Sequence, residues 1–260
     1  MNDPRFSIIT ITYNAGKVLE PTIRSIVEQD YPEIEYLIID GASTDDTLAI
    51  AEKYRDRINY LVSERDKGLY DAMNKGLQAA TGDYVWFMNA GDALHSPFTV
   101  RKIAERIREN GSGLPDVIYG ETAIIDAHRN FIGMRRLKTP DSLTWKSFRM
   151  GMLVCHQAFI ARRALAPAYD TDYRFSADFD WCIRCLKQAT DILNSRLVIA
   201  DYLEEGLTTQ NHKASLKERY HIMCKYYGTP LVAALHGWFA VRTVADRARR
   251  ILKSGNLFHH

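Results

Sequence analysis

The sequence predicts an α/β protein with a doubly wound, mostly parallel central sheet, helices on both of its faces, and additional C-terminal helices. Three observations support this fold class. Up to about residue 95, short apolar runs alternate with amphipathic stretches of helical spacing, which is the order of repeated βα units. Each apolar run ends in small, polar, turn-forming residues. No internal repeat or low-complexity linker divides the chain.

The first half supplies the regular part of this pattern. Apolar and β-branched runs predict strands at residues 6–13, 36–39, 60–63 and 85–88. Apolar residues at helical spacing predict the intervening helices at 17–29, from Ser43 or Thr44 to about Tyr54, and at 69–80. Asp30-Tyr31-Pro32 ends the first of these helices.

The second half is less regular. Strands are expected at 116–119, 156–161 and 193–201, with a strand pair inside 121–136 that turns near 127–130. Helices are expected at 98–110, 178–188, 213–227 and 230–253. The segment 137–151 fits neither pattern and is expected to be a mobile loop over the site.

Composition excludes several classes of protein. The net charge of +2 gives no general argument for binding nucleic acid. The four cysteines are too few and too scattered for a disulfide framework, and we interpret Cys182 and Cys185 as core residues. The N-terminal segment lacks the plan of a signal peptide, and no apolar run is long enough to span a membrane. We therefore expect a cytoplasmic protein.

Polar clusters follow the first four predicted strands, at residues 12–14, 40–41, 64–68 and 89–92. Because parallel strands end at one edge of a sheet, these clusters converge where ligands of open α/β sheets bind. No dinucleotide-binding or P-loop motif is present. Asp40 is placed to accept from a nucleobase N–H, and Asp92 to hold a cation on a diphosphate. Taken alone, each aspartate is more typical of an ordinary turn.

At this point five segments carry a resemblance. Residues 7–14, 40–46, 63–76, 82–84 and 89–92 (SIITITYN, DGASTDD, SERDKGLYDAMNKG, GDY and NAGD) are similar to the family 2 glycosyltransferases of the GT-A fold. The third segment is most similar to the branch found among bacterial exopolysaccharide and lipopolysaccharide gene products. The resemblance implies a nucleotide diphosphate-sugar donor, with UDP favoured over GDP or dTDP. It also implies a divalent metal, Mn²⁺ or Mg²⁺, and inversion at the anomeric carbon.

The resemblance also assigns donor-site residues. Thr12, Tyr13 and Asn14 would border the nucleoside, Asp40 would bind its base, and Asp66 and Lys67 would lie near the donor. Asn89 belongs to the same substrate-binding edge. Asp92 would be the metal-binding carboxylate of the family's Asp-x-Asp-like motif, although Asn89-Ala90-Gly91 supplies no further acid.

Transfer with inversion needs a base that takes the proton of the acceptor hydroxyl. The segment 175–181 resembles the family's Glu-Asp segment, with Ala177 in place of Glu, and its Asp178 matches the base. Asp180 is the less favoured alternative, and both acids also suit the N-terminus of a helix. His156 is expected near donor or acceptor, although a lone histidine is more often structural. The polar segment 208–213 would close over the diphosphate.

The C-terminal helix is amphipathic. Arg242, Arg249, Arg250 and Lys253 fall on one face of a helical wheel, a pattern that suits an anionic membrane surface as well as a helix packed on the domain. We expect a glycosyltransferase domain at 1–212, with a nucleotide-binding half at about 1–95 and an acceptor half at about 96–212. A helical extension at 213–260 would follow.

The predicted function is sugar transfer to a hydroxyl of a bacterial glycan or lipid-linked acceptor, at the cytoplasmic face of the membrane or free in the cytoplasm. Two rivals remain. A sugar nucleotidylyltransferase needs a longer, Gly-rich basic loop after the first strand than Asn14 to Lys17 provide. A nucleotide-sugar-binding subunit without turnover is compatible with the missing acids at Asn89 and Ala177.

Overall fold

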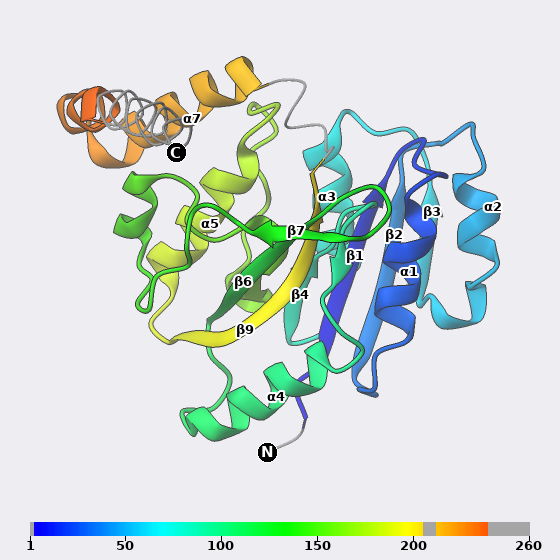
Figure 1. Ribbon diagram of the computed structural model, residues 1–260. Helices are drawn as coiled ribbons and strands as arrows, with labels where there is room; N and C mark the ends of the chain where they lie inside the picture. Colours follow the sequence, from blue (N-terminus) through cyan, green and yellow to red (C-terminus); the bar gives the residue numbers. More distant parts are fainter. Residues whose placement is uncertain (1–2, 205–211, 239–260) are drawn as a thin grey trace, which may run out of the picture.

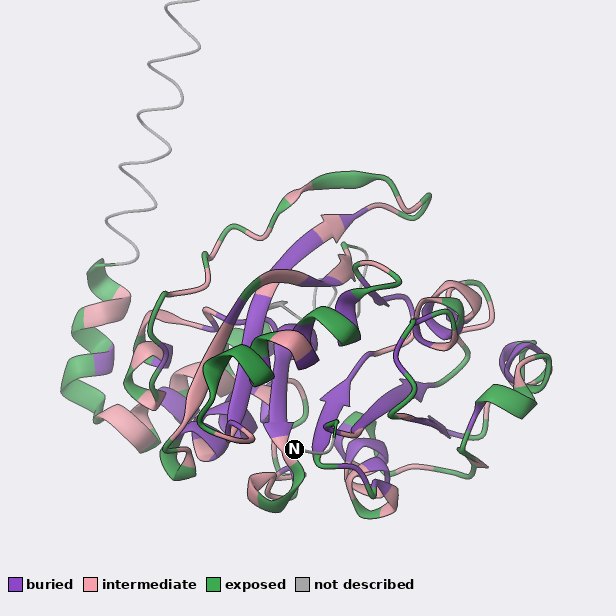
Figure 2. Cartoon of the chain, turned by 90° about the horizontal axis from the view of Figure 1, so that it is seen from below, coloured by how far each residue is buried: buried purple, intermediate pink, exposed green. Residues whose placement is uncertain are grey.

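The computed structural model describes residues 3–204 and 212–238, and its described part confirms the α/β fold class. A sheet of nine strands runs in the order β3-β2-β1-β4-β8-β6-β9-β5, and β7 pairs with β6 (Figure 1). Helices cover both faces of the sheet, and its central strands are buried between them (Figure 2).

The first half follows the predicted βα alternation. Its elements are β1 (Phe6–Thr12), α1 (Leu19–Val27), β2 (Ile34–Asp40), α2 (Thr47–Glu52), a 3₁₀ turn (Arg55–Arg57), β3 (Tyr60–Ser63), α3 (Leu69–Ala79) and β4 (Tyr84–Phe87). The four strands pair in parallel. β1 is buried along its whole length, as expected for a strand covered on both faces.

Helix α3 packs unusually close to the sheet. A Cβ atom added to Gly76 would lie 2.5 Å from Cγ2 of Ile9 and 3.5 Å from Cγ1 of Ile39. The missing side chain therefore lets the helix rest directly on β1 and β2, which fixes the segment that precedes it near the ends of those strands.

The second half mixes strand directions. Its elements are β5 (Ala93–Leu94), α4 (Thr99–Asn110), β6 (Val117–Ile125), β7 (Phe131–Met134), β8 (Phe159–Arg162), α5 (Ala177–Gln188), β9 (Ile192–Leu203) and α7 (His212–Tyr227). β8 is antiparallel to β4 and β6, whereas β9 is parallel to β6. Strands β1–β4 are thus all paired in parallel, and β6 and β9 form a second parallel pair.

Three local predictions need correction. The expected strand at 116–119 and the first strand of the 121–136 pair are one continuous strand, β6, which turns into β7 near the predicted place. His156–Ala158 form a 3₁₀ turn, so that strand begins at Phe159. The segment 137–151 contains a 3₁₀ helix, Trp145–Met150, and Thr144 and Ser147 form a capping box at its N-terminus.

The C-terminal part begins as predicted, with α7 and a second helical stretch over 229–238. Helix α7 packs on α5, where Ser215 and Ser176 are within hydrogen-bond distance at 3.0 Å. Two predicted features fall outside the described residues. One is the cationic face of Arg242, Arg249, Arg250 and Lys253. The other is most of the polar segment 208–213, which is expected to close over the diphosphate.

Two composition-based expectations can be compared with the structure. Cys155, Cys182 and Cys185 are free and buried, which agrees with the interpretation of the Cys182–Cys185 pair as core residues. Over residues 3–204 and 212–238, none of the helices combines the length and the apolar character needed to cross a bilayer.

Candidate active site

The carboxyl ends of the parallel strands bring the predicted donor residues together. Thr12 at the end of β1 is paired with Asp40 at the end of β2, and Asp40 is paired with Ser63 at the end of β3. The turn at 89–92 follows β4 on the other side of β1. The sheet thus places the polar clusters at its carboxyl edge, where open α/β sheets bind ligands.

Asp40 is fully buried and is held by the loop that follows it. Its carboxylate accepts hydrogen bonds from the amide of Ser43 at 2.9 Å, from the hydroxyl of Ser43 at 2.5 Å and from the hydroxyl of Ser63 at 2.6 Å. The loop turns sharply at Ala42, whose φ is 62°. Asp40 therefore fixes the loop after β2 and the end of β3 at the carboxyl edge of the sheet.

Asn14 joins the loops that follow β1 and β2. Its φ is 48°, a left-handed conformation that Asn tolerates well. Its side-chain oxygen accepts from the backbone amide of Thr44 at 2.9 Å, and its backbone amide donates to the hydroxyl of Ser43 at 2.8 Å. Tyr13 beside it is 66% exposed, so an aromatic face is presented at this edge.

Asp66 lies against the same loop. A Cβ atom at Gly41 would be 2.9 Å from Oδ2 of Asp66 and 3.3 Å from the ring of Tyr13. The ammonium of Lys75 lies 2.5 Å from Asp66 Oδ1, and this hydrogen bond, followed by that to Glu64, raises the pKa of Lys75. Sequence reasoning named Lys67 and missed Lys75, which its helical spacing from Asp71 would have indicated.

Lys67, which is expected near the donor, follows Asp66 in the same loop. Its backbone amide donates to Asp71 Oδ2 at 3.0 Å, in the loop that leads into α3. The residue itself is exposed. The cation that the structure places on Asp66 is therefore that of Lys75.

Asp92 is buried behind the turn that follows β4. Oδ2 accepts from the side-chain amide of Gln157 at 2.8 Å, and Oδ1 accepts from the backbone amide of Leu203 at 3.0 Å. Burial raises the pKa of Asp92 to about 7, against the lowering effects of these two hydrogen bonds and of Arg129. His156 is the residue predicted to lie near the donor or acceptor, and its neighbour Gln157 is the one that contacts Asp92.

A side chain of helix α1 holds the turn that carries Asp92. The hydroxyl of Thr22 donates to the carbonyl of Asp92 at 2.7 Å and accepts from the amide of Gly91 at 2.9 Å. Gly91 has a φ of 102°, a conformation that favours glycine. The aspartate therefore points inward on a turn that is held at both ends.

Two buried oxygens at this edge have no hydrogen-bond partner within the described residues, Thr12 Oγ1 and Asn89 Oδ1. A buried polar atom without a partner costs about 1–3 kcal/mol. Both belong to residues that the sequence analysis placed in the donor site. A polar ligand at the carboxyl edge would satisfy them.

A metal would find oxygen ligands here. The described residues contain no group of three or more His, Cys, Asp or Glu side chains able to hold a metal ion. The carboxylate of Asp92 and the unpartnered Oδ1 of Asn89 are nevertheless hard oxygen donors of the kind that Mg²⁺ and Mn²⁺ prefer. This donor set fits a cation whose remaining ligands come from a diphosphate and water.

Asp178 lies in the first turn of α5. Its Oδ1 accepts from the hydroxyl of Tyr70 at 3.2 Å and from the amide of Phe179 at 2.9 Å. Tyr70 belongs to α3, which follows the loop that carries Asp66. The carboxylate that matches the base is thus connected to the donor half of the chain.

Asp180 has different partners. It is fully buried and lies 2.6 Å from the guanidinium of Arg184 and 3.2 Å from the ammonium of Lys225, and it accepts from the hydroxyl of Tyr226 at 2.8 Å. These contacts tie α5 to α7. Asp178 and Asp180 therefore point to different surroundings, as expected for residues two apart on a helix.

His156 belongs to a buried aromatic cluster. Its Nε2 lies 2.7 Å from the hydroxyl of Tyr169, and its ring stacks on Phe87 at 5.3 Å. Burial lowers the pKa of His156, against the raising effect of Asp178. Tyr169 also stacks on Tyr70, with ring centroids 5.7 Å apart, and Tyr70 donates to Asp178. Tyr169 and Tyr70 therefore lie between the histidine and the carboxylate of Asp178.

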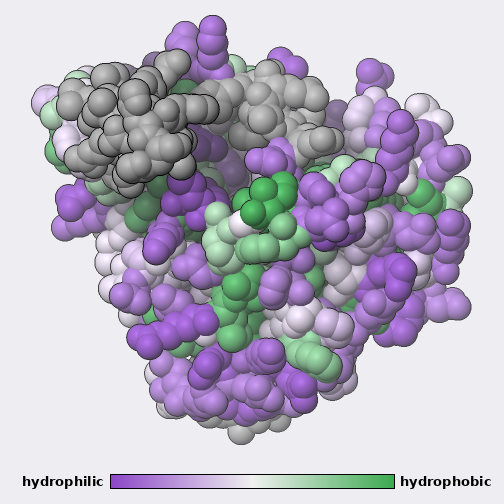
Figure 3. All heavy atoms as spheres, in the orientation of Figure 1, coloured by the Kyte–Doolittle hydropathy of each residue, from purple (hydrophilic) through white to green (hydrophobic). Residues whose placement is uncertain are grey.

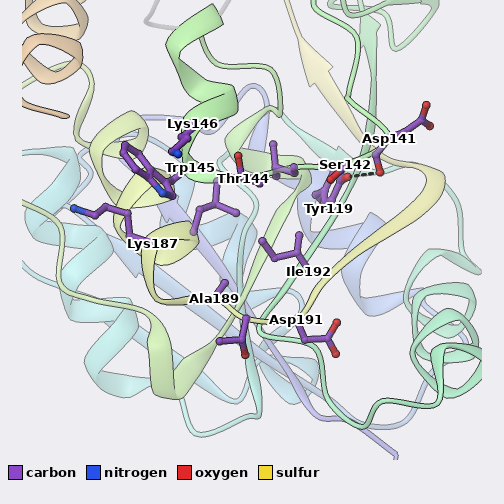
Figure 4. A pocket seen from close by; sticks show the side chains of 13 residues that line it. Tyr119, Asp141, Ser142, Thr144, Trp145, Lys146, Lys187, Ala189, Asp191 and Ile192 are labelled. Carbon is purple, nitrogen blue, oxygen red and sulfur yellow. Dashed lines mark hydrogen bonds between the residues drawn. The ribbon is translucent and has the colours of Figure 1, made fainter. Parts of the chain in front are cut away.

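A separate pocket of about 700 Å³ lies away from this edge (Figure 4). It is lined by the start of β9, the end of α5 and residues 141–146, and Tyr119 donates there to the carbonyl of Pro140 at 2.9 Å. Ile192 in its wall pairs with Val117 at the start of β6, which places the pocket toward the opposite edge of the sheet. It contains none of the predicted site residues.

The fold is similar to that of solved glycosyltransferase structures. The structure of Staphylococcus aureus TarS residues 1–349 in complex with UDP-GlcNAc superposes with a TM-score of 0.67 at 24% identity, over 89% of this chain and 66% of that one. The mannosyltransferase PcManGT from Pyrobaculum calidifontis, in complex with GDP-Man and Mn²⁺, superposes with a TM-score of 0.62 at 16% identity, over 96% and 81%. The fold is that of a GT-A glycosyltransferase.

The sequence comparisons give the family. "Glycosyl transferase family 2" matches residues 7–166. A "PGL/p-HBAD biosynthesis glycosyltransferase" of Mycobacterium bovis (strain BCG / Pasteur 1173P2) is 33% identical over 213 residues, which are 79% of each chain. The poly(ribitol-phosphate) beta-N-acetylglucosaminyltransferase TarS of Staphylococcus aureus (strain Mu50 / ATCC 700699) is 34% identical over 46% of this chain and 24% of its own.

This chain belongs to glycosyl transferase family 2, and it is a glycosyltransferase. The expected family, its bacterial polysaccharide-biosynthesis branch and the GT-A fold class are thereby confirmed.

Proposed function

We propose that this glycosyltransferase moves a sugar, with inversion, from a nucleotide diphosphate-sugar to a hydroxyl of a bacterial glycan or lipid-linked acceptor. The observation that carries the proposal is a pair of buried oxygens at the carboxyl edge of the sheet, Thr12 Oγ1 and Asn89 Oδ1, which have no hydrogen-bond partner in the described part of the chain. A polar donor bound there would satisfy both atoms.

The donor is best described as a UDP-sugar, with GDP- and dTDP-sugars as alternatives. Tyr13 offers an exposed aromatic face beside Asn14, and Asp40 lies beneath the same rim. Among the similar structures, TarS is in complex with UDP-GlcNAc and the mannosyltransferase with GDP-Man. Asp66, positioned by Lys75, would face the sugar-bearing part of the donor.

Asp92 and Asn89 would hold a divalent metal, Mn²⁺ or Mg²⁺. When bound, such a cation stabilises the negative charge of the departing diphosphate. The chain's own contribution is to aim Asp92, through Gln157 and the amide of Leu203, and to keep the buried carboxylate shielded from bulk water.

Asp178 would act as the general base. The acceptor oxygen would attack the anomeric carbon, the bond from that carbon to the diphosphate oxygen would break, and the hydroxyl proton would pass to Asp178. The hydrogen bond from Tyr70 orients the carboxylate. Asp180 is less suited to this role because its oxygens are engaged by Arg184, Lys225 and Tyr226.

The acceptor class rests on the relatives, whose names refer to PGL/p-HBAD biosynthesis and to poly(ribitol-phosphate). We propose a glycan or lipid-linked acceptor and a cytoplasmic location, with no role for nucleic acid. The cationic face of Arg242, Arg249, Arg250 and Lys253 would add a peripheral membrane contact.

Slow hydrolysis of the donor tests the base, because water then takes the place of the acceptor. We expect Asp178→Asn to lower UDP release from a UDP-sugar at least 100-fold, the order of general-base catalysis, while calorimetry shows unchanged UDP binding. Asp172→Asn, at an exposed position of the preceding turn, is the matched control and retains activity. Wild-type hydrolysis by Asp178→Asn would refute the assignment, and a wild-type chain that binds UDP without turnover would favour the binding-subunit alternative.

A further inference from the structure

The hairpin of β6 and β7 exposes an unusual group of apolar side chains. Phe131 is 63% exposed, Ile132 51% and Met134 47%. We call these three residues the apolar ribbon. β7 is hydrogen-bonded to β6 alone in the sheet order and crosses in front of the other strands in Figure 1.

Both faces of this strand are open. Adjacent residues of a strand point to opposite sides, yet Phe131 and Ile132 are both exposed. A Cβ atom at Gly133, between the exposed side chains, would meet nothing within 4 Å. The view from below likewise shows β7 as an exposed strand outside the buried sheet (Figure 2). The hairpin therefore projects from the body of the domain.

Cations outnumber acids around the ribbon, where Asp126 lies in the hairpin turn and accepts from the backbone and side-chain amides of Asn130. No Asp or Glu occurs from Ala127 to Pro140, whereas four residues of this stretch are Arg or Lys. Arg129 and Arg135 donate to the carbonyls of Gly91 and Leu153, at 2.6 and 3.2 Å. Arg136 and Lys138 are exposed, and neither forms an ion pair within residues 3–204 and 212–238.

The ribbon also has a defined place relative to the site. The bond from Arg129 to Gly91 fastens the hairpin turn to the turn that carries Asp92. On the face shown in Figure 3, apolar atoms gather near the centre and are bordered by hydrophilic ones. A surface bound by the ribbon would therefore lie next to the carboxyl edge of the sheet.

We propose that the apolar ribbon, together with Arg136 and Lys138, docks on an anionic lipid bilayer. The three apolar side chains would enter the boundary between head groups and acyl chains, and the two cations would contact lipid phosphates. Charge decides between occupants: pairing of two β7 edges would bring the cations of both copies together, whereas an anionic surface complements them. The inference stands independently of the donor and of the catalytic base.

Vesicle flotation with the full chain tests the proposal. The wild type binds phosphatidylcholine vesicles that contain phosphatidylglycerol and binds pure phosphatidylcholine much more weakly. Phe131→Ser/Ile132→Ser/Met134→Ser lowers the partition coefficient more than tenfold. The control, Tyr60→Ser/Phe98→Ser/Leu216→Ser, removes three other exposed apolar side chains outside the hairpin and binds like the wild type.

The cations are tested separately. Arg136→Gln/Lys138→Gln lowers binding to anionic vesicles about fivefold for each charge removed. Lys102→Gln/Lys217→Gln, at exposed positions outside the hairpin, leaves binding unchanged. All four variants keep the wild-type melting temperature and bind UDP like the wild type, so a failure here is distinguishable from a failure of the proposed catalytic function.

Three results would overturn the proposal. One is equal partitioning of the ribbon variant and the wild type, whether both bind the anionic vesicles or neither does. Another is loss of binding in Arg242→Gln/Arg249→Gln/Arg250→Gln/Lys253→Gln while the ribbon variant still binds, which would assign the contact to the C-terminal helix. The third is a light-scattering mass of a dimer that the ribbon variant reduces to a monomer, which would assign the ribbon to a second copy of the chain.

Discussion

At the scale of single residues, the position of Asp92 depends on two distant partners. Gln157 is 65 residues away in the sequence and Leu203 is 111 residues away. Each occupies one carboxylate oxygen, so together they fix the direction in which the remaining lone pairs point. In the proposed metal site, loss of a residue that orients the ligand Asp92 would lower metal affinity about 10- to 100-fold.

Gln157→Leu tests this orientation. The variant keeps the size of the side chain but removes the donor to Asp92 Oδ2, and we expect metal-dependent UDP binding to weaken about 10- to 100-fold. Titration calorimetry with UDP and Mn²⁺ measures the change. Gln188→Leu, at an exposed position of α5, should bind like the wild type. Equal affinity of the two variants would contradict the positioning role.

His156 gives a prediction about pH. Burial lowers the pKa of His156 in the folded chain, whereas the unfolded chain has a pKa near the usual value of about 6.5. The stability that depends on the neutral ring is thus present above about pH 6.5 and is lost as the pH falls toward the folded-state pKa.

The corresponding measurement is urea unfolding at pH 7.5 and 5.5. The free energy of unfolding of the wild type should fall more steeply than that of His156→Gln, by up to about 1.4 kcal/mol per pH unit. The other titrating groups are shared by both proteins, so the difference isolates His156. Parallel pH profiles would show that the histidine is not held neutral by burial.

At the scale of elements, α5 is fixed to α7 by Asp180. Its carboxylate is fully buried, whereas its partners Arg184 and Lys225 are 27% and 48% exposed at their side chains. We expect Asp180→Ala to lower the free energy of unfolding by about 3 kcal/mol, because a buried network loses its anion.

Urea denaturation checks this value, with Glu109→Ala as the control. Glu109 pairs with Arg106 on the surface of α4, where both side chains are about half exposed, and such pairs contribute at most about 1 kcal/mol. Equal losses in the two variants would mean that the α5–α7 contact does not stabilise the domain.

The elements also show how far sequence reasoning reaches. β1–β4 and α3 follow from local periodicity, and the convergence of Thr12, Asp40 and Asp92 follows from parallel pairing. The roles of Gln157 and Lys75 did not emerge, because the first depends on a contact across 65 residues and the second was hidden beside the more conspicuous Lys67. The strand β6 was divided in two because Gly120 interrupts its apolar run.

At the scale of the whole molecule, a ligand of the folded state raises the melting temperature. UDP with Mn²⁺ at about 100 times its Kd should stabilise the chain by about 2.7 kcal/mol, which corresponds to a rise in melting temperature of about 5–11 °C for a domain of this size. GDP, dTDP and UDP without metal should shift the melting temperature less. No shift with any of the three nucleotides would contradict the donor site.

The two partners of Asp92 have a consequence for how this protein can be divided. Asp92 lies in the half of the chain that is predicted to bind the nucleotide, whereas Gln157 and Leu203 lie in the half that is predicted to bind the acceptor. The halves are therefore not exchangeable modules. A chimera that joins residues 1–95 to the second half of another glycosyltransferase would keep Asp92 but lose the two hydrogen bonds that orient its carboxylate. The orientation would be kept only if the new half supplied a backbone amide and a side-chain donor to the same two oxygens.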